Sequence, residues 1–226
     1  MPNTVWASDR LLYRAVENDD DDFIQNLLWA DSDTFTTGVG MIPTPPSKKD
    51  AGEEREWLQK NLMGAIICLP PSTTAPSTTD NTPPTTDDTT PAAAALANPA
   101  TSKPNPTPIG FITLSDDGPR CLHHRDATIA ISVAKDYQNK GYGSEAILWA
   151  LEWAFWHANL HRVSIGAFGY NARAIHVYER LGFKFEGRTR EVTWYQGRYW
   201  DDVDFGMLEG EWRERYKKVE GAMPVR

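Results

Sequence analysis

The sequence predicts an α/β protein in which one mixed sheet carries helices on its faces. Three observations predict this fold class. Short apolar runs rich in β-branched residues recur along the chain, a strand–helix–strand–helix order occupies residues 127–181, and two further strands surround a tight turn at 196–197. Strands joined through a helix pair in parallel, whereas strands joined by a tight turn pair antiparallel, so we expect both kinds of pairing.

The composition is that of a single domain over residues 1–226. The chain is 40% hydrophobic and 24% charged, and it is long enough to bury a full core. Its formal net charge of -8 argues against a nucleic-acid partner, which needs a basic face, and favours cationic substrates such as amines. Two cysteines make no disulfide framework, and no apolar run has the length of a signal peptide or of a membrane span. We therefore expect no membrane partner and a cytoplasmic location.

The N-terminal part of the chain contains signals for two helices and three strands. The first helix begins with acids, which suit its positive end, and Ser47 is a suitable N-cap for the second. The last two apolar runs are bounded by turn-forming residues, and we expect them to pair as a hairpin. The elements expected here are a strand over 11–15, helices over 20–29 and 47–63, and strands over 64–69 and 109–114.

Residues 70–108 differ in kind from the rest of the chain. They are dominated by Thr, Pro, Ser, Ala and Asp, contain no aromatic residue, and hold ten of the sixteen prolines. Such a segment has too little apolar area to offset the entropy lost on ordering, so we expect a low-complexity disordered insert. Loop-closure entropy grows slowly with length, so a hairpin tolerates such an insert. A loop without function is the simpler interpretation, and a regulatory role is the alternative.

The second half of the chain gives the clearest pattern. One apolar stripe recurs at helical spacing along its first helix, formed by Ile147, Leu151, Ala154, Phe155 and Ala158. Asn171 suits the N-cap of a shorter helix, and Gly182 suits the left-handed residue after its last turn. Gln196-Gly197 suits a tight turn. The elements expected here are strands over 127–133, 162–168, 187–195 and 198–208, helices over 144–160 and 171–181, and a C-terminal tail over 211–226.

The segment Gln138-Asn-Lys-Gly-Tyr-Gly-Ser144 joins a predicted strand to the long helix. Its two glycines let the backbone approach a ligand closely. The first turn of a helix adds unpaired N–H groups and a positive dipole end, so the segment suits a phosphate or a pyrophosphate. A tight turn that only needs small residues is the plain alternative.

Two other phosphate-binding patterns can be compared with the sequence. The P-loop pattern Gly-x-x-x-x-Gly-Lys-Ser/Thr does not occur. Gly141, Gly143 and Ala146 match a variant of the dinucleotide-binding fingerprint, which requires an acid about 20 residues further on to hold the ribose. No Asp or Glu lies between Glu152 and Glu179. An NAD(P)-binding oxidoreductase is therefore the weaker alternative.

Several motifs follow one another in a fixed order. They are Gln138-x-x-Gly141-x-Gly143 before a helix, then Asn171, Ala174, Tyr178 and Leu181-Gly182-Phe183. This series resembles the GNAT superfamily of N-acetyltransferases. Gly197-Arg-Tyr-Trp-Asp201 and Met207-Leu208 are similar to the branch that contains ribosomal-protein and polyamine acetyltransferases. The resemblance is dense from 129 to 208 and thin before it.

The resemblance implies a GNAT-type fold, which is a mostly antiparallel twisted sheet flanked by helices. It also implies an N-acetyltransferase that moves an acetyl group from acetyl-CoA to a primary amine by direct attack. The amine acceptor would be a small-molecule amine, a polyamine or a protein N-terminus. A non-catalytic CoA-binding sensor or scaffold is the alternative. Dimers are common in this branch, so a homodimer is one expected state.

The resemblance also assigns residues. In the family, the strand that ends here at Val133 splays from its neighbour, pairs with the pantetheine, and polarises the thioester carbonyl through a backbone N–H. Tyr178 is the expected general acid, because a tyrosine with an ordinary pKa of about 10 stays protonated at neutral pH and can protonate the departing thiolate. A core tyrosine with a satisfied hydroxyl is the alternative. The implied cofactor-binding residues are Ile131, Val133, Gln138, Asn139, Lys140, Gly141, Tyr142, Gly143, Ser144, Asn171 and Tyr178.

The general base is less well defined. Some family members use a Glu on the strand that matches 127–133, but this strand contains no acid. His124, Glu191 and Asp201 are candidates, and a water chain is an equal alternative. No Cys/His cluster has zinc spacing, so no metal is expected. Four aromatic residues of the last two strands are expected to border the acceptor, namely Trp194, Tyr195, Tyr199 and Trp200.

Overall fold

The computed structural model describes residues 4–29, 45, 47–71, 105–116 and 118–216. Most of the expected insert, 72–104, lies outside the described residues, as does 217–226 of the expected tail. The disorder of the insert therefore stays a prediction. The last two residues of the expected insert, 107 and 108, belong to β3, which begins at Thr107.

Seven strands form one sheet, in the order β1-β2-β3-β4-β5-β7-β6. Among the strands that the structure describes, β4 and β5 make the single parallel pair, and every other neighbouring pair is antiparallel. The mixed, mostly antiparallel sheet is confirmed, and so is the pairing of β2 with β3. The parallel sheet that the NAD(P)-binding alternative requires is not formed. The strands are β1 (Leu12–Arg14), β2 (Met63–Leu69), β3 (Thr107–Ser115), β4 (Asp126–Val133), β5 (Arg162–Phe168), β6 (Lys184–Tyr195) and β7 (Arg198–Leu208).

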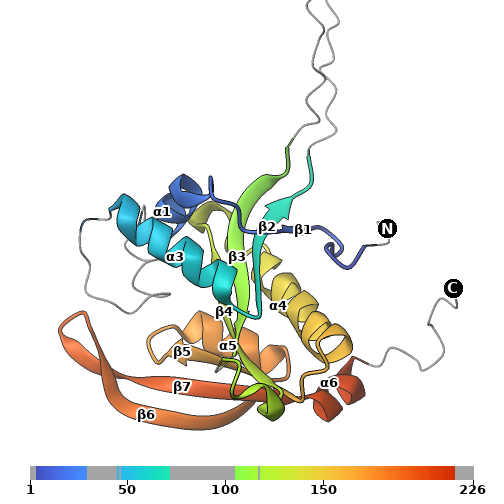
Figure 1. Ribbon diagram of the computed structural model, residues 1–226. Helices are drawn as coiled ribbons and strands as arrows, with labels where there is room; N and C mark the ends of the chain where they lie inside the picture. The colour runs from blue at the N-terminus through green and yellow to red at the C-terminus, as the bar shows by residue number, and fades with distance from the viewer. Residues whose placement is uncertain (1–3, 30–44, 46, 72–104, 117, 217–226) are drawn as a thin grey trace, which may run out of the picture.

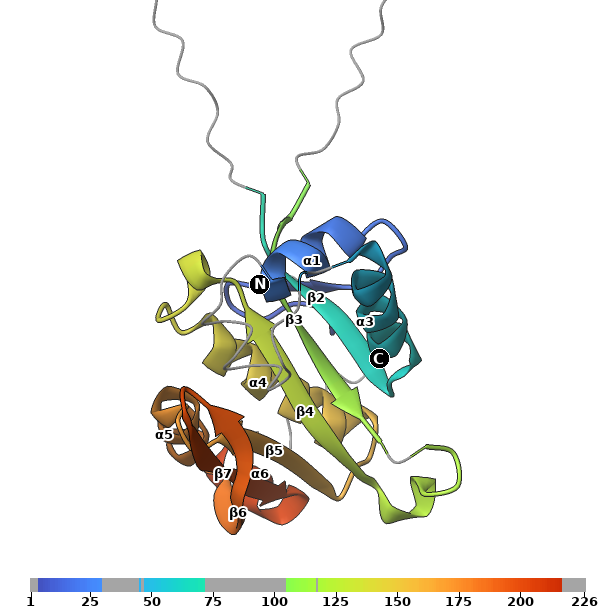
Figure 2. The same cartoon turned by 90° about the vertical axis from the view of Figure 1, so that its left-hand side faces the viewer.

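Helices cover both faces of the sheet. In Figure 1, α1 and α3 lie on one side of the central strands and α4 lies on the other. Figure 2 shows the same arrangement along the perpendicular direction, with α5 beside the β5–β7 end of the sheet. No helix within the described ranges is long and apolar enough to cross a membrane. The helices are α1 (Asp21–Trp29), α3 (Lys48–Lys60), α4 (Tyr142–Glu152), α5 (Ala172–Arg180) and α6 (Glu209–Arg215).

The two faces of the sheet bury separate apolar clusters. Ile112 on β3 packs in the larger cluster, which contains α4 and α5 residues such as Ile147 and Tyr178. Its neighbour Phe111 packs in the smaller cluster with Leu58 of α3. Successive side chains of a strand point to opposite faces, so this split follows directly from the strand geometry. The sheet therefore separates an α4/α5 face from an α1/α3 face.

Local capping signals predicted several boundaries correctly. The Asn171 side chain accepts a hydrogen bond from the Ala174 N–H at 3.1 Å and caps α5. Gly182 has φ +88°, the left-handed conformation expected after that helix. Gln196 and Gly197 both have positive φ and form the turn between β6 and β7. Strands β5 and β7 have the expected bounds.

The long helix differs from its expectation at both ends. It begins two residues early, at Tyr142, because Gly141 with φ +83° turns the chain into the helix. Regular α-helix stops at Glu152, and Trp153–His157 form a π-helical turn in which the Ala158 N–H donates to the Trp153 carbonyl. The apolar stripe is still buried from Ile147 to Phe155. Periodicity alone does not distinguish these two helical geometries.

Other boundaries were wrong as well. β6 begins at Lys184 and not at 187, and β3 begins at Thr107 and not at 109. Met63 begins β2 and does not end α3, because Asn61 has an extended backbone and closes the helix. The expected tail from 211 begins within α6. That helix has glutamates in its first turn and arginines in its last turn, which suits the helix dipole, and it buries Trp212 against the core.

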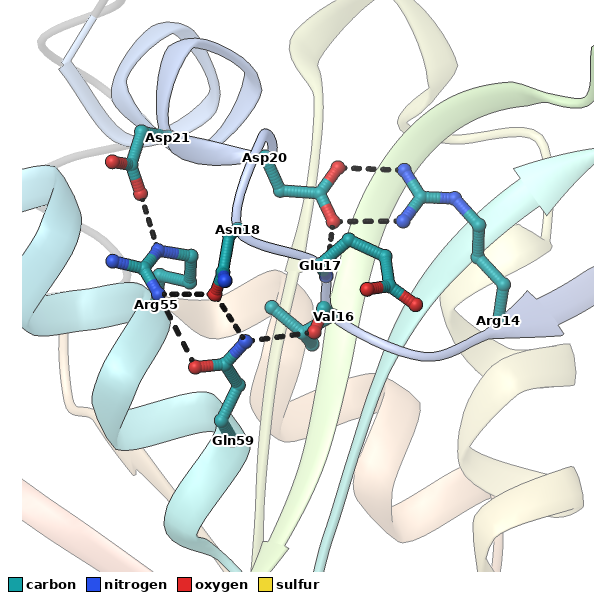
Figure 3. Close-up of polar contacts among 8 residues, drawn as sticks. All are labelled: Arg14, Val16, Glu17, Asn18, Asp20, Asp21, Arg55 and Gln59. Carbon is teal, nitrogen blue, oxygen red and sulfur yellow. Dashed lines mark hydrogen bonds and ion pairs between the residues drawn. The ribbon is translucent and has the colours of Figure 1, made fainter.

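A polar network attaches the segment before α1 to β1 and α3 (Figure 3). Arg14 donates two hydrogen bonds, at 2.6 and 2.7 Å, to the carboxylate of Asp20, which is buried. Arg55 of α3 donates to Asp21 at 2.6 Å and to the Asn18 side-chain oxygen at 2.9 Å. Gln59 donates to a backbone carbonyl of the same segment at 2.9 Å. These bonds fix the position of α3 over the sheet.

Gly64 provides a test of the contact between α3 and β2. An added Cβ would lie 2.1 Å from the Leu58 carbonyl oxygen, so α3 or β2 must move in Gly64→Ala. We expect the free energy of unfolding in urea to fall by about 1–3 kcal/mol, the usual cost of overpacking. Gly187→Ala is the control, since an added Cβ there meets no atom within 4 Å. Equal stability of the two variants would contradict the packing described.

The Arg14–Asp20 pair predicts a pH dependence of stability. Burial acts to raise the pKa of Asp20, but the hydrogen bonds from Arg14 and from the Glu17 N–H outweigh it and hold this pKa below its ordinary value. A carboxyl with a depressed pKa stabilises the fold above its unfolded value of about 3.9, and this contribution is lost as the pH falls through the lower folded value. The free energy of unfolding should therefore decrease in acid less steeply in Asp20→Asn than in the wild type. The exposed neighbour Asp22 gives the control Asp22→Asn, which should keep the wild-type slope.

Candidate active site

The candidate site is a cavity of about 870 Å³ at the place where β4 and β5 separate. The parallel ladder between the two strands ends at the pair Ile129–Ile165. β4 continues to Val133 and β5 to Phe168, and both extensions line the cavity. β4 stays paired with β3, and β5 stays paired with β7, so both walls of the gap are rigid. The volume is that of a site for a small organic ligand.

Most of the residues expected at the cofactor lie in the wall of this one cavity. Lys140 and Tyr142 are the exceptions. The Lys140 ammonium lies 5.5 Å from the centre of the Tyr137 ring, and the Tyr142 ring packs against Arg10 at 4.7 Å. Neither residue contributes to the wall of the cavity. The expected residues that line it are Ile131, Val133, Gln138, Asn139, Gly141, Gly143, Ser144, Asn171 and Tyr178.

The loop before α4 presents donors to the cavity. Gly141 is the N-cap, and the first backbone hydrogen bond of the helix runs from the Glu145 N–H to the Gly141 carbonyl. The N–H groups of Tyr142, Gly143 and Ser144 therefore have no partner within the helix. The loop itself is held because the Gln138 side chain donates to the Val133 carbonyl at 2.8 Å. Such a helix start suits a phosphate group.

Two arginines of α5 face this loop. Arg173 donates to the Gln138 side-chain oxygen at 2.6 Å, and Arg180 donates to the Ser144 hydroxyl at 3.1 Å. Both line the cavity. No motif in the sequence pointed to them, although they are seven residues apart, the same two-turn spacing that separates Asn171 from Tyr178. Their guanidinium groups make this end of the cavity basic and suited to phosphate.

The N-terminal segment supports the loop from outside the cavity. The Glu145 carboxylate accepts hydrogen bonds of 2.7 Å from the Ser8 hydroxyl, the Arg10 N–H and the Arg10 guanidinium. Burial acts to raise the pKa of Glu145, but these donors outweigh it and hold that pKa below its ordinary value. Arg10 also donates to the Lys140 carbonyl at 3.0 Å. The contact between Arg10 and Glu145 joins residues 135 positions apart, so no local pattern could have predicted it.

Tyr178 is buried except for its access to the cavity. Its ring packs beside Phe183 and Phe205, with centroids 6.2 and 6.0 Å away. Its hydroxyl makes no hydrogen bond to a described residue, yet no buried side-chain oxygen in the described chain is left unsatisfied, so the hydroxyl is open to the cavity. Burial raises the pKa of Tyr178 to about 12, with Arg173 acting weakly in the opposite direction. The phenol is therefore protonated at neutral pH, and the alternative of a satisfied core hydroxyl does not hold.

The cavity passes through the sheet. On β7, Val203 and Phe205 pack in the α4/α5 cluster, so Asp202 and Asp204 point to the other face. Both acids line the cavity, together with Glu54 and Trp57 of α3. Arginines therefore border the cavity on the α4/α5 face, and carboxylates border it on the α1/α3 face. These acids were not predicted from the sequence, because they lie outside the motifs at 138–144 and 171–183.

The three candidate bases named from the sequence do not line the cavity. His124 lies in a short 3₁₀ turn before β4 begins, at the opposite end of that strand from Val133. The Asp201 carboxylate accepts from the Glu191 N–H at 2.8 Å and pairs with Arg188, within the β6–β7 hairpin. None of the three contributes to the wall. A base must be within reach of the proton that it removes, so the structure does not support any of these three residues as the general base.

The four aromatic residues expected around the acceptor lie elsewhere on the hairpin. Trp194 is 61% exposed and packs on Tyr199 with ring centroids 4.9 Å apart. Tyr195 stacks on Tyr170, and Trp200 packs against the Arg198 guanidinium. None of the four is in the cavity wall. Trp194 and Tyr199 lie on one face of the hairpin, and Tyr195 and Trp200 lie on the other, because successive residues of a strand point to opposite sides.

Comparisons with known proteins agree with this geometry. The family model described as an Acetyltransferase (GNAT) domain matches residues 10–184. The chain is 34% identical over 92 residues to a spermidine N(1)-acetyltransferase of Vibrio cholerae, which is 41% of this chain and 53% of that protein. It is 28% identical over 94 residues to the spermidine N(1)-acetyltransferase of Escherichia coli (strain K12), which is 42% of this chain and 50% of that protein. The chain thus spans about half the length of the curated relatives that it matches.

Solved structures extend the similarity to almost the whole fold. The crystal structure of spermidine N-acetyltransferase from Vibrio cholerae in complex with CoA and spermine has a TM-score of 0.65 and 22% sequence identity. The match covers 91% of this chain and 99% of that one. At this identity, the comparison shows that the two chains share a fold.

Proposed function

The chain belongs to the GNAT acetyltransferase family, and from that premise we propose that it transfers an acetyl group from acetyl-CoA to a primary amine. One observation supports this proposal most directly. The unpaired edge of β4, the open N–H groups before α4 and the free Tyr178 hydroxyl all border the same cavity. These are the three groups that bind a thioester, hold a diphosphate and protonate a leaving thiolate.

The α4/α5 face would hold the coenzyme. The N–H groups at the start of α4 would bind its diphosphate, with Arg173 and Arg180 neutralising the charge. The backbone of β4 beyond Ile129 has no strand partner on the β5 side, so it can pair with the amide groups of pantetheine as with an added strand. Lys140 and Tyr142 would contribute through their backbone only.

Amide formation would then follow by direct attack. The gap holds the amine and the thioester carbonyl in line, and such positioning supplies much of the rate. A backbone N–H near Val133 would polarise the carbonyl. Tyr178 would donate its proton to the thiolate as the C–S bond breaks. Neither cysteine lines the cavity, which agrees with a reaction without a covalent enzyme intermediate.

The class of acceptor follows from the charge of the α1/α3 face. Carboxylates at that opening suit an ammonium group, and relatives act on spermidine. The open hydroxyl of Tyr178 favours catalysis over the non-catalytic sensor or scaffold, which has no need of it. We propose an alkylamine or polyamine acceptor, with a peptide N-terminus as the second class to be compared.

A thiol-release assay tests the proposed reaction. The wild type should release CoA from acetyl-CoA with at least one member of a panel of spermidine, 1,4-diaminobutane, lysine and a short peptide amide. Tyr178→Phe keeps the ring packing but removes the proton donor, so kcat should fall by about 100-fold or more. Tyr199→Phe is the control, since it removes the same hydroxyl from an exposed tyrosine outside the cavity wall. Unchanged turnover in Tyr178→Phe would remove this residue from the mechanism.

Binding of the coenzyme tests the loop before α4. Gly141 has φ +83°, so Gly141→Ala places a side chain in a strained backbone and moves the donors of the helix start. We expect the Kd for CoA, measured by calorimetry, to rise by about tenfold or more, which corresponds to about 1.4 kcal/mol. Gly118→Ala is matched in backbone strain, with φ +87°, but lies outside the cavity. Equal CoA affinity in the two variants would show that the loop does not hold the diphosphate.

A further inference from the structure

Glu54 lies on α3, on the α1/α3 face of the sheet, and borders the same cavity as Tyr178. The next two residues on this face of the helix are Trp57, which also lines the cavity, and Leu58, which is fully buried against the sheet. Residues three and four positions apart share a helix face, so Glu54 points toward the sheet and not toward solvent. It is half-buried.

The Glu54 carboxylate has no partner among the described residues, since it makes no hydrogen bond or ion pair there. By contrast, the charged residues next to it on α3 have partners. Glu53 pairs with Lys49 at 3.2 Å, Glu56 pairs with Lys60 at 3.0 Å, and Arg55 is bound to Asp21 and Asn18. Burial raises the pKa of Glu54 above its ordinary value, and no neighbouring cation opposes this shift. A half-buried carboxylate without a cation is costly, and a cationic ligand would relieve that cost.

The position of Glu54 is rigid. The helix that carries it is tied to the segment before α1 by the Arg55 and Gln59 contacts of Figure 3. Gly64 allows the end of α3 to lie directly against β2. A carboxylate that is held in this way can meet a ligand in one defined geometry, as a base must.

The other carboxylates of the cavity are less suitable as bases. Asp202 accepts a hydrogen bond of 2.7 Å from the Thr193 hydroxyl, so one of its oxygens already has a partner. Asp204 is exposed, so water competes for it. β4 carries no acid between Ala127 and Val133. Within the described cavity wall, Glu54 is the carboxylate that is both partly desolvated and free.

We propose that Glu54 binds the ammonium of the acceptor and removes its proton, acting as the general base of the reaction; this inference rests on the proposed function. An alkylammonium with a pKa of about 10.4 must lose a proton before its nitrogen can attack. That proton passes to Glu54, and the nitrogen lone pair forms the C–N bond to the acetyl carbonyl carbon. The C–S bond breaks, Tyr178 protonates the thiolate, and the second proton of the nitrogen restores the phenol. The sum is ammonium plus thioester giving amide, free thiol and one proton, which Glu54 releases to solvent.

Glu54→Gln tests this role, because it keeps the size of the side chain and removes only the charge. With the best acceptor of the panel, we expect kcat/KM for the amine to fall by about 100-fold or more, while KM for acetyl-CoA changes by less than about twofold. Glu54→Asp should retain part of the activity. Glu53→Gln is the matched control, since Glu53 is the adjacent exposed acid of the same helix. A structural role alone would lower stability without this division between the two substrates.

Calorimetry separates failure of this inference from failure of the proposed function. Spermidine is titrated into the wild type and into Glu54→Gln, each saturated with CoA, and we expect about tenfold weaker binding in the variant. If no amine of the panel is acetylated by the wild type, the proposed function fails. The difference in spermidine affinity between the wild type and Glu54→Gln then shows whether Glu54 binds an ammonium group. Wild-type turnover and spermidine affinity in Glu54→Gln would overturn the inference. It would also be overturned if the wild-type complex binds no spermidine.

Discussion

The early end of the parallel ladder between β4 and β5 is the constraint on which the site depends. Two parallel strands normally satisfy each other's backbone groups along their whole length. Here the register ends at Ile129 and Ile165, and both strands continue. Each strand keeps its antiparallel partner on the far side, so neither can move to close the gap. The sheet therefore holds open a row of unpaired backbone groups in a buried place, where a ligand with peptide-like amides can pair with them.

The second consequence of the gap is a passage between two chemically different faces. The larger apolar cluster supports α4 and α5, which bring helix N–H groups and two arginines to one opening. The smaller cluster supports α1 and α3, which bring carboxylates to the other. In the proposed reaction, an acyl donor with phosphates and an acceptor with an ammonium would enter from opposite sides according to their charge. They would meet at the gap, next to Tyr178.

Much of this arrangement was predictable from the sequence wherever a local signal existed. Asn171, Gly182 and Gln196-Gly197 act within one turn of themselves, and each was placed correctly. The strand–loop–helix order located the loop before α4, and the structure puts that loop and Tyr178 in one cavity. The π-helical turn after Glu152 was missed because a single turn of five residues is too short to change the apolar stripe visibly. Contacts between distant segments could not be predicted either. Arg10 with Glu145, and Glu54 across from β7, depend on how elements far apart in the chain pack together.

The same physical effect tunes both groups that exchange protons in the proposed reaction. Burial raises the pKa of Tyr178 and of Glu54 alike. For the tyrosine, a higher pKa means that the phenol is protonated at neutral pH and has a proton to give when the thiolate departs. For the glutamate, a higher pKa means a stronger base toward an ammonium held against it. Burial thus leaves the two groups in opposite roles, one as acid and one as base, because their ordinary pKa values already lie on opposite sides of neutrality. Both groups line the gap that the strand pairings hold open, so the fold and the proposed chemistry depend on the same few strand pairings.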